Sequence, residues 1–165
     1  MSDADSTRSS LRESLIEHAF IFGVLQEAWR RHEVIEVLRP EVDIGVDIVL
    51  ERGATTRHVQ LKSRRSDSKV ARYDVNELLA AKPSATVVLI EFEDCAGELR
   101  LQYRFFGGPP GQPLPLDGLK TAKHSKGNAQ GVKLERPGIK VVPIGQFKRV
   151  SDIATLVDLL FGKSI

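Results

Sequence analysis

The chain has 165 residues, which is enough for one domain with a hydrophobic core and too few for two domains of ordinary size. Its composition, with 41% hydrophobic and 28% charged residues, excludes a largely disordered chain, and its single cysteine excludes an internal disulfide and a zinc finger. The net charge of +2 is unevenly distributed: residues 1–51 contain 11 acidic and 5 basic side chains, and residues 52–165 contain 11 acidic and 19 basic side chains.

The first elements of the chain are a tail, a helix and a strand. Residues 1–9 are polar and predict a flexible tail. Ser10 and Glu13 have the spacing of a capping box, and the apolar residues after them predict a long, largely buried helix over residues 11–31. Residues 34–38 are a β-branched run that predicts a strand. The sequence has neither a secretory leader nor a membrane-spanning segment, so we expect a cytoplasmic protein with no membrane contact.

Two alternating stretches, residues 42–51 and 57–64, predict a β-hairpin around a short turn-prone segment. Asp47, Gln60 and Lys62 share its polar face. Paired residues of an antiparallel hairpin have position numbers with a constant sum, so the turn allows Asp47 to lie opposite Gln60 or opposite Lys62. In either register we expect Asp47 within about 8 Å of both side chains.

The remainder of the chain alternates between strands and helices. Asp74 and Glu77 form a second capping box, which predicts a short helix that ends near Ala81. Further predicted elements are strands at residues 86–92, 99–106 and 139–144, a loop at residues 107–115, and a closing helix, capped by Ser151 or Asp152, that ends at residue 161. This order predicts one α/β domain over residues 10–165, with a mixed central β-sheet flanked by helices.

The polar face of the hairpin has the side chains that hydrolysis of a phosphodiester needs. Mg²⁺ prefers oxygen ligands, so we expect Asp47, the side-chain oxygen of Gln60 and the backbone carbonyl of Leu61 to bind it, with Mn²⁺ as a substitute. Lys62 would then hold the attacking water and stabilise charge on the phosphate. Glu17 joins this set because a carboxylate on an apolar helix needs compensation. The predicted catalytic set is Glu17, Asp47, Gln60 and Lys62.

A solvated surface is the alternative interpretation of the same residues. The acidic side chains of one strand and the basic side chains of the other would then form cross-strand ion pairs. Glu17 would extend to solvent, or bond to His18 or Arg30. Two observations favour a site: Gly45 leaves room on the polar face for close approach, and helices predicted at both ends of the hairpin suggest cover on both faces.

Two basic segments predict a nucleic-acid-binding surface. The first follows the strand of Lys62 directly, and the second lies in the basic loop over residues 107–136. Such side chains neutralise phosphates and position a duplex without reading its sequence, whereas the alternative for each segment is a solvated loop. The candidates are Arg64, Arg65, Lys69 and Arg72 in the first segment, and Lys120, Lys123, His124, Lys126 and Lys133 in the second.

Taken together, the motifs over residues 10–90 resemble a known family. A helix bearing Glu17, then Gly45-Val46-Asp47 in an apolar strand, then Gln60-Leu61-Lys62 in the next, resembles the PD-(D/E)XK nuclease superfamily, and the glutamine is similar to that of Mrr-type restriction endonucleases. The resemblance implies a restriction-endonuclease-like fold with a mixed sheet of four or five strands, and Mg²⁺-dependent cleavage of duplex or branched DNA. Nucleases of this type often act as homodimers. The alternative is a protein of the same fold that binds nucleic acid or a partner protein without cleaving.

Overall fold

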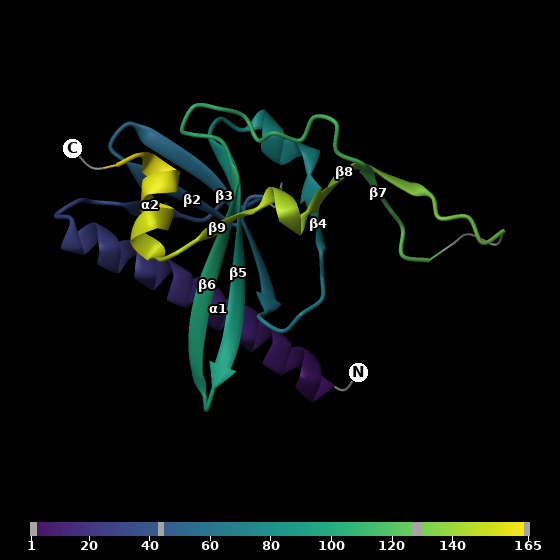
Figure 1. Cartoon of the computed structure of the whole chain (residues 1–165), viewed down its shortest axis with the longest axis horizontal. Coiled ribbons are helices and arrows are strands. Elements are labelled where there is room, and N and C mark those ends of the chain that lie inside the picture. Colours follow the sequence, from purple (N-terminus) through teal and green to yellow (C-terminus); the bar gives the residue numbers. More distant parts are fainter. Residues whose placement is uncertain (1–2, 43–44, 127–129, 164–165) are drawn as a thin grey trace.

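A six-stranded sheet with the order β1-β2-β3-β5-β6-β9 lies at the centre of the fold (Figure 1). The computed structural model of the chain describes residues 3–42, 45–126 and 130–163. β3 and β5 are parallel, whereas the other neighbours in this sheet are antiparallel, so the sheet is mixed as predicted. Its strands are β1 (Glu36–Leu38), β2 (Ile48–Arg52), β3 (Thr55–Arg65), β5 (Ala85–Cys95), β6 (Glu98–Gly107) and β9 (Lys148–Val150).

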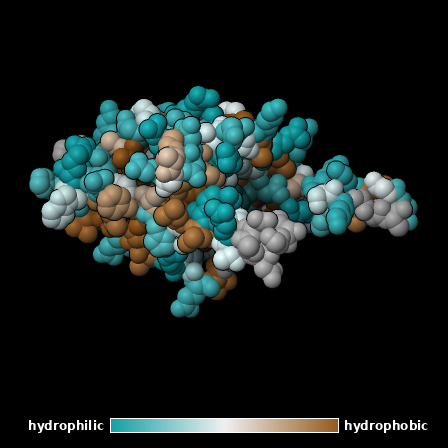
Figure 2. Space-filling view, turned by 90° about the horizontal axis from the view of Figure 1, so that it is seen from below, coloured by the Kyte–Doolittle hydropathy of each residue, from teal (hydrophilic) through white to brown (hydrophobic). Residues whose placement is uncertain are grey.

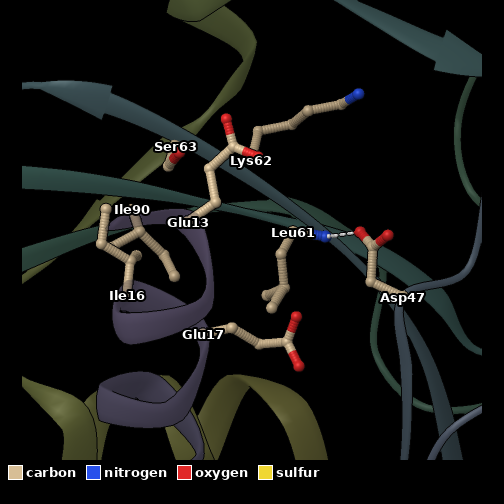
Figure 3. A pocket seen from close by; sticks show the side chains of 8 residues that line it. All are labelled: Glu13, Ile16, Glu17, Asp47, Leu61, Lys62, Ser63 and Ile90. Atoms are coloured by element: carbon tan, nitrogen blue, oxygen red, sulfur yellow. Dashed lines mark hydrogen bonds between the residues drawn. The ribbon is translucent and has the colours of Figure 1, made fainter. Parts of the chain in front are cut away.

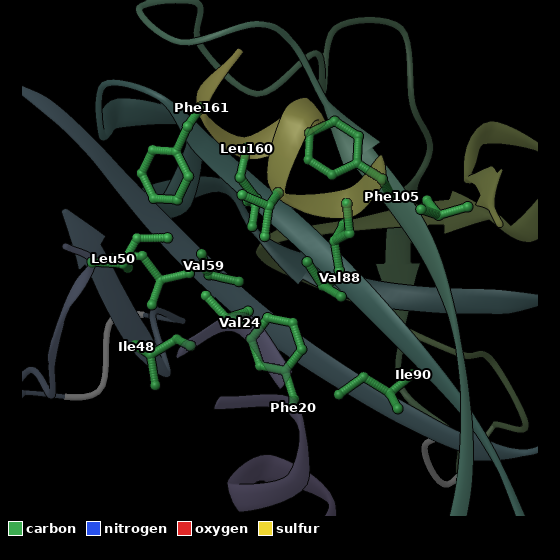
Figure 4. Close-up of a cluster of buried hydrophobic side chains, with 14 of the residues drawn as sticks. Phe20, Val24, Ile48, Leu50, Val59, Val88, Ile90, Phe105, Leu160 and Phe161 are labelled. Atoms are coloured by element: carbon green, nitrogen blue, oxygen red, sulfur yellow. The ribbon is translucent and has the colours of Figure 1, made fainter. Parts of the chain in front are cut away.

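Two α-helices, α1 (Asp3–Arg30) and α2 (Ile153–Phe161), pack on the same face of this sheet. Their apolar side chains meet those of β3, β5 and β6 in one core (Figure 4). Phe20 of α1 and Leu160 of α2 are fully buried there, and so is Val59 of β3. Asp152 caps α2, as predicted, because its carboxylate accepts a hydrogen bond from the backbone N–H of Thr155 at 2.7 Å.

A second, three-stranded sheet covers the opposite face. Its strands have the order β4-β8-β7. The 3₁₀-helix η1 (Glu77–Ala81) follows β4 directly in the sequence. Val75 and Leu79 from this layer pack against Val87, Leu89 and Phe106 of the central sheet. Its strands are β4 (Arg72–Asn76), β8 (Glu135–Pro143) and β7 (Thr121–Lys123). Both faces of the central sheet are therefore covered, and the predicted single-domain α/β class is confirmed.

Helix α1 differs from its prediction at its start and in its burial. It begins at Asp3, so most of the predicted tail is helical and the capping-box start at Ser10 is wrong. Residues 3–9 contain no glycine or proline, so nothing in their chemistry ends the helix before Ser10. Only one face of α1 is buried: Leu11 is 68% exposed and Trp29 is 83% exposed, so the prediction of a largely buried helix is also wrong. Hydrophobic patches remain visible on the face shown in Figure 2.

Four further elements, β4, η1, β7 and β9, differ from the sequence prediction. Asp74 lies within β4, where its carboxylate pairs with Arg136 at 2.6 Å, so it does not begin a helix. The N-cap of η1 is Asn76, whose side chain accepts from the backbone N–H of Leu78 at 2.9 Å. β7 and β9 were not predicted, and β7 lies inside the segment predicted as a basic loop. Among the helices in the described ranges, none is long and apolar enough to cross a membrane.

Candidate active site

The register of the hairpin β2–β3 sets the position of Asp47. Ile48 pairs with Val59, and the turn is centred between residues 53 and 54. Of the two predicted registers, the one that sets Asp47 opposite Gln60 is therefore confirmed, and the one opposite Lys62 is wrong. Because β2 begins at Ile48, Asp47 lies just before its paired part, where β3 continues without a partner strand on that side.

The backbone of β3 holds Asp47 in place. The N–H of Asp47 donates to the carbonyl of Val59 at 3.0 Å, and Oδ2 of Asp47 accepts from the N–H of Leu61 at 2.6 Å. In a β-strand the N–H and C=O of one residue point to the same edge, so the Leu61 carbonyl faces the edge on which Asp47 lies. A carboxylate and a backbone carbonyl thus face the same unpaired edge of β3.

A cleft of about 170 Å³ brings the predicted side chains together (Figure 3). Glu17, Asp47, Leu61 and Lys62 all line it, although they come from α1, from the segment just before β2, and from β3. The carboxylates of Glu17 and Asp47 point into the space beside Leu61, and Glu13 and Lys62 lie on the other side of Leu61 in this view. One ordered water needs roughly 10–15 Å³ of such space, so the cleft has room for an ion with several waters.

The carboxylate of Glu17 is paired with Arg39. Its Oε1 lies 2.5 Å from Nη2 of Arg39, and the two side chains are 25% and 56% exposed, respectively. The contact is an ion pair without hydrogen-bond geometry, since Glu17 Oε1 is buried and has no hydrogen-bond partner among the described residues. Neither predicted alternative partner is used: His18 bonds to the backbone of its own helix, and Arg30 bonds to Glu27.

Gln60 is the predicted ligand that does not line this cleft. Its side chain points toward the face that the second sheet covers, and the residue is only 7% exposed. A Cβ at Gly45 would lie 3.3 Å from Nε2 of Gln60 and 3.0 Å from Cβ of Asn76, and φ is +81° there, so glycine is needed for both space and backbone conformation. The predicted polar face is thus corrected: Lys62 reaches the cleft, but Gln60 is packed inward.

The oxygen atoms at and near the cleft fit a hard divalent cation. Among the described residues, the buried side-chain oxygens without a hydrogen-bond partner belong to Glu17 and Gln60, both predicted ligands. Glu17 Oε1 has an ion-pair partner in Arg39, so within the described part of the chain the oxygen without any partner is that of Gln60, and leaving such an acceptor unsatisfied costs about 1–3 kcal/mol. No group of three His, Cys, Asp or Glu side chains able to hold a metal occurs in the described ranges, so the fit depends on the Leu61 carbonyl as well as on Glu17 and Asp47.

Two polar residues that line the cleft, Glu13 and Ser63, were not predicted as part of the site. Glu13 lies one helical turn before Glu17, and its i,i+4 spacing would have identified it. Ser63 follows Lys62, and strict alternation along a strand places these two side chains on opposite faces. Lys62 and Ser63 both line the cleft because the cleft opens around the unpaired edge of β3. A single face of the hairpin therefore could not predict the complete lining.

Arg64 is not available to bind phosphate, so its predicted role is corrected. Its guanidinium forms an ion pair with the carboxylate of Glu91, and its side chain is 11% exposed. It also donates to the carbonyl of Val70 at 2.6 Å. Burial by itself would raise the pKa of Glu91, but the contacts with Arg104 and Arg64 outweigh it and hold that pKa below its usual value. Arg64 is therefore a core residue that ties β3 to β5.

The other predicted basic residues are accessible. Arg65 pairs with Asp67 at 3.1 Å, but both side chains are at least 65% exposed. Lys69 and Arg72 are also exposed. In the second basic segment the exposed residues are Lys120, Lys123, His124, Lys126 and Lys133. They lie on or beside β7 and the start of β8, which form an arm that projects from the body of the molecule (Figure 1).

The chain shows no sequence match to known families. Neither protein-family models nor curated proteins match it. The residues that carry the PD-(D/E)XK resemblance, Glu17, residues 45–47 and residues 60–62, lie on α1 and across the hairpin β2–β3. The resemblance therefore rests on these residues alone.

Proposed function

We propose that the chain is a metal-dependent endonuclease of the restriction-endonuclease-like type, which hydrolyses phosphodiester bonds of DNA. The observation that supports this most is that Glu17, Asp47 and Lys62 all line the same cleft. A carboxylate pair attracts a hard cation, and an ammonium group beside it attracts the phosphate.

The residues of the cleft divide the work as follows. Asp47, Glu17 and the carbonyl of Leu61 would hold Mg²⁺, or Mn²⁺ in its place, whereas Gln60 would add an oxygen only if its side chain turned from the second sheet toward the cleft. When bound, the ion lowers the pKa of a coordinated water and neutralises phosphate charge. Lys62 orients the attacking water and stabilises the extra negative charge on the phosphate as it is attacked. The hydrogen bond from Leu61 fixes the Asp47 carboxylate, so it does not have to reorganise during the reaction.

The DNA would contact the accessible basic residues. Arg65, Lys69 and Arg72 continue from the strand of Lys62, and the β7–β8 arm would neutralise phosphates further along a duplex. A homodimer would bring two clefts to the two strands of a duplex. α2 would not supply such an interface, because Leu156 and Leu160 are fully buried in the core. The free thiol of Cys95 is consistent with a reducing cytoplasm as the place of action.

A second candidate function is nucleic-acid binding without cleavage. Arg39 already supplies a positive charge at Glu17, and Gln60 is neutral where the resembled nucleases usually have an acidic residue. Both features reduce the negative charge available to a cation. In this alternative the cleft would bind a phosphate through Lys62 and Arg39 and leave it intact.

Substitution of Lys62 separates the two functions. We expect the wild-type protein to nick supercoiled plasmid with Mg²⁺ or Mn²⁺, and Lys62→Ala to nick it about 100-fold more slowly, because one charge-stabilising donor is lost. Lys62→Ala should still shift DNA in a gel, and Lys163→Ala, at an exposed lysine, should behave as wild type. If the wild type binds duplex, single-stranded or branched DNA but cleaves none of them, the second candidate holds.

A further inference from the structure

A groove of about 560 Å³ lies between the first turns of α1 and the far ends of β3, β5 and β6. It combines positive charge with apolar surface. Its lining contains three arginines, one acidic residue, Asp94, and the two exposed apolar side chains of Leu11 and Leu15. We call it the arginine groove and define it by Arg8, Leu11, Arg12, Leu15, Arg65 and Phe92.

The arginine groove continues the catalytic cleft along the same elements. Ser63 and Ile90 line the cleft, and Arg65 and Phe92 line the groove two residues further along β3 and β5. Two residues of a β-strand span about 7 Å, which corresponds to roughly two nucleotides at the duplex rise of about 3.4 Å and to fewer nucleotides of an extended, unpaired strand. A strand whose phosphate occupies the cleft would therefore reach the groove within its next few nucleotides.

The chemistry of the groove fits an unpaired strand better than a duplex. A duplex presents phosphates and groove edges, whereas the faces of its bases are stacked against one another and inaccessible. Apolar and aromatic side chains gain contact with base faces only where the bases are unpaired. Leu11 and Leu15 are 68% and 52% exposed. The Phe92 ring is only 5% exposed, so the flat group that the groove offers to a base is the guanidinium of Arg12, which lies 5.6 Å from the centre of that ring. An arginine plane held in this way can stack on a base.

The groove also has charge available for the phosphates of that strand. Arg8 and Arg12 are exposed. Arg65 pairs with Asp67, but side chains that are 65% and 70% exposed form a weak pair, which a phosphate can displace. The basic residues of the β7–β8 arm have no aromatic side chain among them, so they suit the backbone of a duplex.

We propose that the arginine groove binds a single-stranded segment next to the scissile phosphate, so that the preferred substrate is DNA with an unpaired end or branch joined to a duplex. This proposal rests on the proposed function of the cleft. It divides the surface into two parts: the arm holds the duplex, and the groove holds the unpaired strand. The substrate class is set by the groove rather than by the catalytic residues.

Binding of labelled DNA without divalent cations tests the proposal directly. The probes are a blunt duplex of about 20 base pairs and the same duplex with a 3′ or a 5′ overhang of about 10 thymidines. Fluorescence anisotropy measures the binding of each probe. We expect one overhang probe to bind at least about tenfold more tightly than the blunt duplex. The double variant Arg12→Ala, Leu15→Ser should lose that preference, whereas Arg100→Ala, at an exposed arginine outside the groove lining, should keep it.

The outcomes separate this proposal from that of the cleft. Equal affinity for all probes, or no binding to any probe, overturns the role of the groove, and the second result would point to a protein ligand. A preference that survives in the double variant also overturns it. Overhang preference without cleavage supports the groove and rejects hydrolysis, whereas equal cleavage of blunt and overhang DNA supports hydrolysis and rejects the groove.

Discussion

Asp47 and Leu61 are joined by a hydrogen bond of 2.6 Å in which the backbone N–H of Leu61 donates to the Asp47 carboxylate. This bond takes the place of a strand contact, because β2 pairs with β3 only from Ile48 onward. The Asp47 carboxylate therefore has two positions at once: it is hydrogen-bonded to the backbone of β3 at the end of the hairpin, and it lines the cleft. Its structural role and its proposed metal-binding role can be separated by substitution.

Asp47→Asn should separate the two roles of this side chain. The amide oxygen of asparagine can still accept from Leu61, so we expect a free energy of unfolding within about 1 kcal/mol of wild type. The loss of charge should abolish Mn²⁺ binding, measured by electron paramagnetic resonance, and plasmid nicking. Asp47→Ala removes the acceptor as well, and should lower the unfolding free energy by a further ~1 kcal/mol in urea titrations. Wild-type Mn²⁺ affinity in Asp47→Asn would exclude the cleft as a metal site.

Arg39 should compete with a cation for Glu17. Its guanidinium lies 2.5 Å from the carboxylate, so a metal must displace it. Both groups are partly exposed, so the pair is worth at most about 1 kcal/mol, and Arg39→Ala should tighten Mn²⁺ binding by up to about fivefold. Calorimetric titration measures this, and Arg100→Ala, an exposed arginine that does not line the cleft, serves as the control. Weaker Mn²⁺ binding in Arg39→Ala would show that Arg39 supports the ion and does not compete with it.

Gln60→Glu tests whether the buried side-chain oxygen at this position takes part in metal binding. A carboxylate at this 7% exposed position should destabilise the metal-free protein, because burial of a charge without a partner is costly. If Gln60 is a ligand, Mn²⁺ should raise the Tm of Gln60→Glu more than that of wild type, by mass action on the folded state. Equal Mn²⁺-induced shifts in the two proteins would remove Gln60 from the site and leave Glu17, Asp47 and Leu61.

The hairpin could be predicted from the sequence because its information is local. The turn limited the register to two choices, one of which is confirmed. The predicted alternation over residues 42–51 is wrong before Ile48, where β2 begins: Val46 packs against the second sheet, whereas Ile48 and Leu50 pack against the helices. Alternation did not show what covers each face. The polar face of Gln60 meets the second sheet and not solvent, and this sheet forms through contacts between residues far apart in the chain, such as Tyr73 with Val142.

Contacts between residues far apart in the chain also explain the wrong prediction of a helix start at Asp74. Its spacing from Glu77 is that of a capping box, but pairing with β8 holds residues 72–76 extended, and the cap moves to Asn76. In the candidate site, Glu17 was predicted from its polar character on an apolar helix, and it does line the cleft. Arg64 was assigned to the surface from charge alone. Its partner Glu91 lies 27 residues away on β5, so local sequence could not reveal the pair.

Glu27 should make folding sensitive to acid. Its carboxylate is 5% exposed and accepts hydrogen bonds from Arg30 and from Arg31 at 2.6 Å. The bond from Arg30 contributes most, and together with Arg31 it lowers the pKa of Glu27 from 4.5 to about 2 against the opposing effect of burial. Because the folded state has the lower pKa, the stabilisation is complete above about pH 4.5 and is lost as the pH falls toward 2.

Glu27→Gln should therefore destabilise the protein by about 1–3 kcal/mol at neutral pH. Its unfolding free energy should converge with that of wild type between pH 4.5 and 2. Urea titrations at a series of pH values measure both effects, and Glu98→Gln, at an exposed carboxylate, should follow wild type throughout. A difference between Glu27→Gln and wild type that stays constant down to pH 2 would mean that the side chain stabilises the helix by packing, and that its charge contributes nothing.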